Sequence, residues 1–141
     1  MVSNRVFSVC LAALPILLVV SCTNQTPQAT TQDKKTELCT NLARLNTSVA
    51  TLKSLSPSST VSDLQAARDQ VKTTFADVKT SAQAVQEAKV ADLEQAYQEL
   101  DKAVNAIPQT ATLNQAAQSI APQVAAVENA RNQVEAGVNC P

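Results

Sequence analysis

The segment LCTNLARLNTSVATLKSLSPSSTVSDL, residues 38–64, decides the fold of this chain. Pro57 ends a helix within it, because a proline disfavours helical geometry in the residue before it. Thr60 and Asp63 match the capping box that opens a helix, so a second helix is expected to follow. Large apolar residues recur in the first part at spacings of 4, 3, 4 and 3, as in a heptad repeat, namely Leu38, Leu42, Leu45, Val49 and Leu52. We therefore predict a helical hairpin, with a first helix from Thr31 or Asp33 to Leu55.

The stretch that follows carries two apolar stripes with helical spacing and contains no Gly or Pro between Thr60 and Pro108. The second stripe lies about 50° around the helix axis from the first, and this change of phase resembles a four-residue stutter. We therefore expect one long central helix, straight or kinked. The stripe residues are Leu64, Val71, Phe75, Val78, Ala82 and Val85, then Val90, Leu93, Tyr97, Leu100, Val104 and Ile107.

A last helix is expected after Pro108, with Thr110 or Thr112 as its cap. Pro122 lies inside it and should kink or split it, since proline removes one backbone hydrogen bond. Gly137 is the expected helix stop. The apolar stripe of this helix is Leu113, Ala117, Ile120, Val124, Val127, Val134 and Val138.

Composition excludes several classes of function. The chain has 141 residues, which is room for one domain, and it contains no histidine and a single glycine. There is therefore no histidine base or metal ligand and no glycine-rich phosphate loop. We expect no catalytic residue, no metal site and no cofactor, so the protein is not expected to be an enzyme. The carboxylates Asp92, Glu94, Glu99 and Asp101 alternate with lysines and glutamines, as on a solvated helix face.

The first 21 residues read as a secretory leader, with Arg5 in a polar start, an apolar run from Val6 to Val20, and small Ser21 before Cys22. The apolar run is shorter than the ~20 apolar residues of a spanning helix. Its last residues, Val19-Val20-Ser21-Cys22, resemble the lipobox of bacterial lipoproteins. The resemblance implies cleavage before Cys22 and acylation of its thiol, by palmitate or similar chains. The alternative is an ordinary secreted protein with a chance cysteine at this place.

The mature chain divides into a flexible polar tether, residues 22–32, and a helical domain, residues 33–141. The tether sequence TNQTPQATTQ, residues 23–32, has too little apolar content to order itself. The lipoprotein resemblance places the domain outside the cytoplasm, at the outer membrane if the cell has one and otherwise on the outer face of the plasma membrane. In bacterial lipoproteins the residue after the lipidated cysteine can direct sorting. Here it is Thr23 and not the aspartate that signals retention, so the resemblance favours the outer membrane.

Two cysteines remain after lipidation, Cys39 and Cys140, and an oxidising compartment favours a disulfide between them over two free thiols. Such a bond disfavours a bundle of three equal helices, whose ends would lie at opposite poles. Two all-α folds satisfy it. The first, which we favour, packs antiparallel hairpins on the long central helix; the second is a four-helix up-down bundle with a break near residues 83–88. Only the first would leave the leucines of residues 38–52 partly exposed and so favour a dimer.

Arg131 occupies an apolar position of the last stripe, between Val127 and Val134. We expect either a polar layer that sets register, near Gln86 and Glu87, or a side chain that reaches solvent.

The charge and the motifs of the sequence predict only a broad class of function. Arg5 is the only charge of the leader, so the mature part keeps ten basic and twelve acidic residues, which does not favour nucleic acid as a partner. The chain is similar to small alanine-rich helical proteins of bacteria that carry two bracketing cysteines. We expect a membrane-anchored envelope lipoprotein that acts as a structural or protein-interaction module, with an envelope protein or a second copy as partner. The alternative is a module that binds a lipid or a small apolar ligand.

Overall fold

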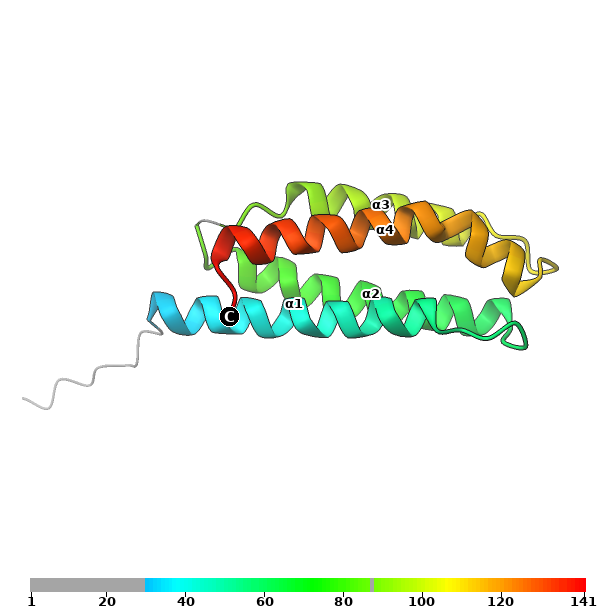
Figure 1. The fold of residues 1–141 in the computed structure, drawn as a ribbon, viewed down its shortest axis with the longest axis horizontal. Coiled ribbons are helices and arrows are strands. Elements are labelled where there is room, and N and C mark those ends of the chain that lie inside the picture. Colours follow the sequence, from blue (N-terminus) through cyan, green and yellow to red (C-terminus); the bar gives the residue numbers. More distant parts are fainter. Residues whose placement is uncertain (1–29, 87) are drawn as a thin grey trace, which may run out of the picture.

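The computed structural model describes residues 30–86 and 88–141, and these form an all-α fold without strands (Figure 1). The predicted leader, Cys22 and the tether as far as residue 29 lie outside the described residues. The all-α prediction is confirmed. The four helices are α1 (Thr31–Lys53), α2 (Val61–Ala82), α3 (Ala91–Asn105) and α4 (Leu113–Val138).

The helices alternate in direction along an elongated bundle. In Figure 1, α1 runs from left to right, α2 returns, α3 runs to the right again, and α4 returns to the end at which α1 begins. Each helix packs on the next in sequence and α4 packs on α1, with the most extensive packing inside the pairs α1–α2 and α3–α4. This pattern of contacts fits the four-helix up-down bundle, which was our alternative. The long central helix was the wrong choice.

A break of eight residues, 83–90, separates α2 from α3 although it contains neither glycine nor proline. Short turns replace the helical bonds here: the Ala84 N–H donates to the Ser81 carbonyl at 3.2 Å, and the Val85 N–H to the Ala82 carbonyl at 3.0 Å. Val85 is only 2% exposed. These turns interrupt the helix, so that α3 folds back over the core. The break coincides with the change of phase that the sequence showed between Val85 and Val90.

Capping boxes begin three of the four helices. Thr30 caps α1 together with Asp33, and Thr60 caps α2 together with Asp63, each pair exchanging side-chain and backbone hydrogen bonds. The helix therefore begins at Thr31, two residues before the predicted start of the domain. Thr112 caps α4 in the same way, as one of the two expected caps, and its partner is Gln115.

The end of α4 differs from the prediction. Gly137 lies inside the helix, and the helix ends one residue later, at Val138. Asn139 takes the left-handed conformation, with φ 55° and ψ 56°, that we had expected glycine to supply. Asparagine tolerates this conformation because its short polar side chain bonds locally.

Pro122 does not split α4, which is continuous from Leu113 to Val138. Figure 1 shows the orange, N-terminal part of this helix inclined to the red part, so the bend that we predicted is seen. Pro122 is exposed, and its ring therefore faces away from the core.

The core is built from the predicted apolar stripes. Leu38, Leu42, Leu45 and Leu52 are 0–3% exposed. Among the described residues no Leu, Ile, Val, Phe or Tyr is exposed; only Leu55 and Val90 are half-buried. The dimer that we predicted for a long central helix therefore loses its premise, because the four helices already cover these leucines.

Candidate functional site

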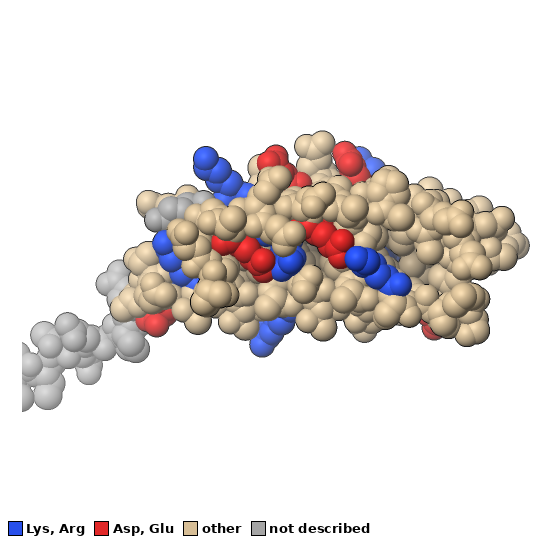
Figure 2. All heavy atoms as spheres, in the orientation of Figure 1, with Lys and Arg blue, Asp and Glu red and all other residues tan. Residues whose placement is uncertain are grey.

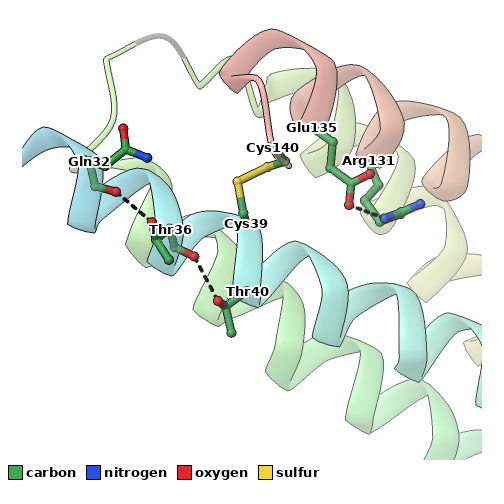
Figure 3. The surroundings of a disulfide bond; sticks show 7 residues. All are labelled: Gln32, Thr36, Cys39, Thr40, Arg131, Glu135 and Cys140. Atoms are coloured by element: carbon green, nitrogen blue, oxygen red, sulfur yellow. Dashed lines mark hydrogen bonds and ion pairs between the residues drawn. A yellow bond between two sulfur atoms is a disulfide. The ribbon is translucent and has the colours of Figure 1, made fainter.

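The two predicted cysteines meet at the end of the bundle where α1 begins. Cys39, in the third turn of α1, forms a disulfide with Cys140, two residues beyond the end of α4, and their Cα atoms are 5.6 Å apart (Figure 3). The bond joins residues 101 positions apart in the sequence. It fastens the segment after α4 to α1, at the end of the bundle where α1 begins.

A wide polar groove of about 960 Å³ surrounds this disulfide, lined by α1 and the end of α4. Its threonines carry no activated hydroxyl: Thr36 donates to the Gln32 carbonyl at 3.0 Å, and Thr40 to the Thr36 carbonyl at 2.9 Å, as Figure 3 shows. Both hydroxyls therefore donate to backbone carbonyls of their own helix.

The polar partners of Arg131 lie on its own helix, α4. It forms an ion pair with Glu135, one turn further along α4, and its Nη2 donates to Asn132 Oδ1 at 2.6 Å. Gln86, one of the two predicted neighbours, is exposed, and residue 87 lies outside the described residues. The Arg131 side chain is 12% exposed and its partners Glu135 and Asn132 lie on its own helix, while the predicted neighbour Glu87 falls outside the described residues.

A different arginine, which the sequence did not reveal, joins α2 to α3. Arg68 Nη1 lies 2.9 Å from Asp101 Oδ1, and the Arg68 side chain is only 15% exposed. Beside this pair the rings of Phe75 and Tyr97 stack with centroids 4.5 Å apart. Burial, with a smaller contribution from the charge of Asp101, raises the pKa of Tyr97.

The carboxylates of α3 do not form an acid and base pair. Asp101 is bound to Arg68, Glu94 to Lys79 on α2, and Glu99 accepts a hydrogen bond from Gln95 at 3.3 Å. Asp92 is exposed. Asp101 and Glu94 thus tie α3 to α2, while Asp92 and Glu99 are exposed, as on the predicted solvated face.

An apolar groove of about 280 Å³ lies in the far half of the bundle, between the end of α1 and the first half of α4. An ion pair stands on its border, with Lys53 Nζ 2.8 Å from Glu128 Oε1. The sequence analysis missed this groove. Its lining is Leu52, Lys53, Leu55, Leu64, Leu113, Ala117, Ile120, Ala121, Val124, Ala125 and Glu128.

A sequence signal for this end of the molecule was nevertheless present. Residues 103–127 contain no charged side chain, and neither do residues 54–62. The first stretch includes the first half of α4, and the second contains the loop from α1 to α2. In a chain that is 16% charged, such uncharged runs indicate that this end of the molecule has an uncharged surface.

Other kinds of site are not seen in the part of the chain that the structure describes. Within residues 30–86 and 88–141, no three side chains of Cys, Asp or Glu gather as metal ligands would. No helix in these ranges has the length and apolar content to cross a membrane. No family model, curated protein or solved structure matches this chain.

Proposed function

We propose that this protein is a lipid-anchored lipoprotein of the bacterial cell envelope, whose four-helix bundle serves as a structural or protein-interaction module. The observation that carries the proposal is the lipobox-like Val19-Val20-Ser21-Cys22 at the end of an apolar leader. Lipid attached to Cys22 would hold the domain outside the cytoplasm. Two or more acyl chains make such attachment lasting, whereas one chain binds only reversibly.

The fold is compatible with an anchor at this place. The eight residues between Cys22 and Thr31 span at most ~26 Å when fully extended. The start of α1, the disulfide and the C-terminus lie at one end of the bundle (Figure 1). That end would therefore stay near the membrane, and the opposite end would project away from it.

The interaction role rests on what the domain offers chemically. Its buried residues form a packed apolar core, and the ion pairs Lys53–Glu128, Arg68–Asp101 and Lys79–Glu94 join helices to one another. The hydroxyls in the disulfide groove donate to their own helix. We therefore propose that the bundle acts by binding through its surface, and that its partner is an envelope protein.

Mass spectrometry and cell fractionation test the anchor. The intact mature protein should have the mass of residues 22–141 plus acyl groups, and Cys22→Ser should move it from the membrane to the soluble fraction. Cys10→Ser is the matched control, because Cys10 lies in the leader and should be removed with it. An unmodified wild-type protein in the soluble fraction would refute the lipoprotein assignment.

A second candidate function, binding of a lipid or small apolar ligand, is favoured by the apolar groove between α1 and α4. Its volume of about 280 Å³ falls just below the ~300–1,000 Å³ of typical ligand pockets. We therefore rank this function second. Native mass spectrometry of the purified domain tests it, and a lipid retained with defined stoichiometry would place it first.

A further inference from the structure

The connection between α2 and α3 has the composition of a helix, although it forms turns. Residues 83–90 read QAVQEAKV, and Ala, Gln, Glu and Lys are among the strongest helix formers. If this segment became helical, α2 and α3 would join into one helix over residues 61–105. The break is therefore maintained by the packing of the helices around it and not by its own sequence.

Each of the two hairpins, α1–α2 and α3–α4, covers an apolar face of the other. Phe75 of α2 stacks on Tyr97 of α3, with ring centroids 4.5 Å apart, and buried residues of all four helices form one core cluster. On the face presented in Figure 2, acidic and basic side chains lie next to one another along the line where α4 meets α1. Lys53 and Glu128 form an ion pair between these two helices. If a hairpin left its partner, the surface that matches it in shape and charge would be the same hairpin of a second copy.

The stacked contact between α2 and α3 is centred on the break. Phe75 and Tyr97 stand equally far from residue 86 in the sequence. Two copies of a continuous helix would therefore lie antiparallel about a twofold axis near residue 86, with Phe75 of each copy stacked on Tyr97 of the other. Val85, which is 2% exposed in the single chain, would meet its counterpart beside this axis and stay buried. An exchange of hairpins between two copies thus keeps the register of the interface.

The two cysteines lie at the end of the bundle where such an axis would pass. Figure 1 shows the end of α2, the start of α3 and the end of α4 together at the left, near the start of α1. Cys39 belongs to the α1–α2 hairpin, whereas Cys140 follows the α3–α4 hairpin. If the hairpins are exchanged, Cys39 of each copy therefore meets Cys140 of the other. The disulfide then records which hairpins are packed together.

We infer that this chain forms a domain-swapped dimer, in which residues 61–105 are one continuous helix and the α1–α2 hairpin of each copy packs on the α3–α4 hairpin of the other. The dimer repeats the contacts between hairpins and adds helical hydrogen bonds in the break, and it loses the translational freedom of one chain. The inference names a second copy as the partner, goes beyond the proposed function and does not depend on it.

Formation of the Cys39–Cys140 disulfide traps whichever form is present. The two thiols, from one chain or from two, lose two electrons and two protons to a small disulfide such as oxidised glutathione, which becomes two thiols. Before this step the hairpins exchange between copies. After it, a bond between chains makes the dimer covalent, and a bond within a chain ties the two hairpins of the monomer together.

Isotope labelling of the full wild-type chain, purified in detergent, tests the inference. Equal amounts of unlabelled and nitrogen-15-labelled chain are mixed, unfolded in urea with reductant, refolded and reoxidised with glutathione. One sample is dilute, and the other is at ~1 mM, the order of the effective concentration of two modules joined by a short linker. In the concentrated sample, mass spectrometry should find Cys39 of one label joined to Cys140 of the other. Same-label peptides alone in both samples would overturn the inference, and so would Cys39–Cys39 bonds as frequent as Cys39–Cys140 bonds between chains.

A proline in the break gives an independent readout. Gln86 is exposed, and among the described residues no backbone-to-backbone hydrogen bond has its N–H as donor, so Gln86→Pro removes no such bond from the monomer. In a continuous helix the same proline would remove a hydrogen bond and clash with the preceding turn. The mixed-label fraction should therefore fall about tenfold or more in Gln86→Pro and persist in the control Gln86→Ala. Melting temperatures near that of the wild type will show that both variants fold, and an undiminished mixed-label fraction in Gln86→Pro would contradict the continuous helix.

Discussion

Asn139 and Gly137, at the end of α4, show how single residues direct this fold. Asn139 has a φ of 55°, the only positive φ among the described residues. The turn it makes lets the Cys140 N–H donate to the Glu135 carbonyl at 3.0 Å, so the chain reverses and Cys140 reaches Cys39. Gly137, by contrast, occupies an ordinary helical position and contributes nothing that requires glycine.

Replacement of Gly137 should therefore stabilise the domain. Apart from its chain neighbours and the backbone of its own helix, no atom lies within 4 Å of a Cβ built at this position. Alanine loses less conformational freedom than glycine in a helix, so Gly137→Ala should raise the free energy of unfolding by ~0.5–1 kcal/mol. The measurement is thermal or urea unfolding followed by circular dichroism.

Asn139→Val is the matched comparison for Gly137→Ala. A β-branched residue in the left-handed conformation costs on the order of 1–2 kcal/mol, so this variant should be destabilised. If Gly137→Ala lowers stability, the helix does not continue through residue 137 in solution.

At the scale of the helices, the sequence predicted most starts and stops but not the break between α2 and α3. Capping residues are local signals, and the Thr60–Asp63 box was therefore predictable. The change of phase between Val85 and Val90 marked the place of the break, but the same pattern also fits a continuous helix. Burial of Val85 and Val90 against the rest of the chain decides between the two. Helices gain most of their stability from packing, so tertiary burial outweighed the helical propensity of this segment.

The candidate sites divide in the same way. The Cys39–Cys140 pairing followed from the cysteine count, whereas Arg68 and the apolar groove are made by residues from separate helices. Arg131 stood out in the apolar pattern, but its ion-pair partner, Glu135, lies on the next turn of its own helix. The spacing of residues along one helix cannot distinguish an arginine that pairs with another helix from one that pairs within its own helix.

The two acidic caps make the helix starts sensitive to acid. Hydrogen bonds from the Thr30 side chain and backbone lower the pKa of Asp33, and those from the Thr60 backbone and side chain lower the pKa of Asp63 below 3.8. A carboxylate whose pKa is lower in the folded state stabilises the fold above its unfolded pKa. This stabilisation is lost as the pH falls through the folded pKa. The cap of α4 uses Gln115, which does not titrate.

Asp63→Asn should therefore be less stable than the wild type near neutral pH, and the two melting temperatures should converge as the pH falls below 3.8 and through the lowered pKa of Asp63. Thermal unfolding monitored by circular dichroism across this range tests the prediction. Glu37→Gln removes an exposed carboxylate of α1 that takes no part in a capping box, and serves as the control. A constant difference between Asp63→Asn and the wild type at all pH values would show that the cap does not titrate.

At the scale of the whole molecule, the bundle consists of two hairpins whose mutual packing is less extensive than the packing within each. Arg68–Asp101 and Lys79–Glu94 join the hairpins on the α2–α3 side. On the α1–α4 side, the disulfide fastens one end, the exposed Lys53–Glu128 pair lies further along, and the groove lies beside that pair in the far half. Exposed ion pairs contribute little, so the disulfide is the main fastening on this side.

Loss of the disulfide should therefore have a large effect on the whole domain. A bond that closes a loop of about 100 residues stabilises the folded state by ~4–5 kcal/mol in the chain-entropy model, so Cys140→Ser should lower the melting temperature by on the order of 15 °C. The wild type should show no reactive thiol in the folded, air-exposed protein. A reductant should bring its melting temperature down to that of Cys140→Ser while leaving the double variant Cys39→Ser/Cys140→Ser unaffected. If the wild type contains two free thiols, or melts at the same temperature with and without reductant, then packing alone holds α4 against α1.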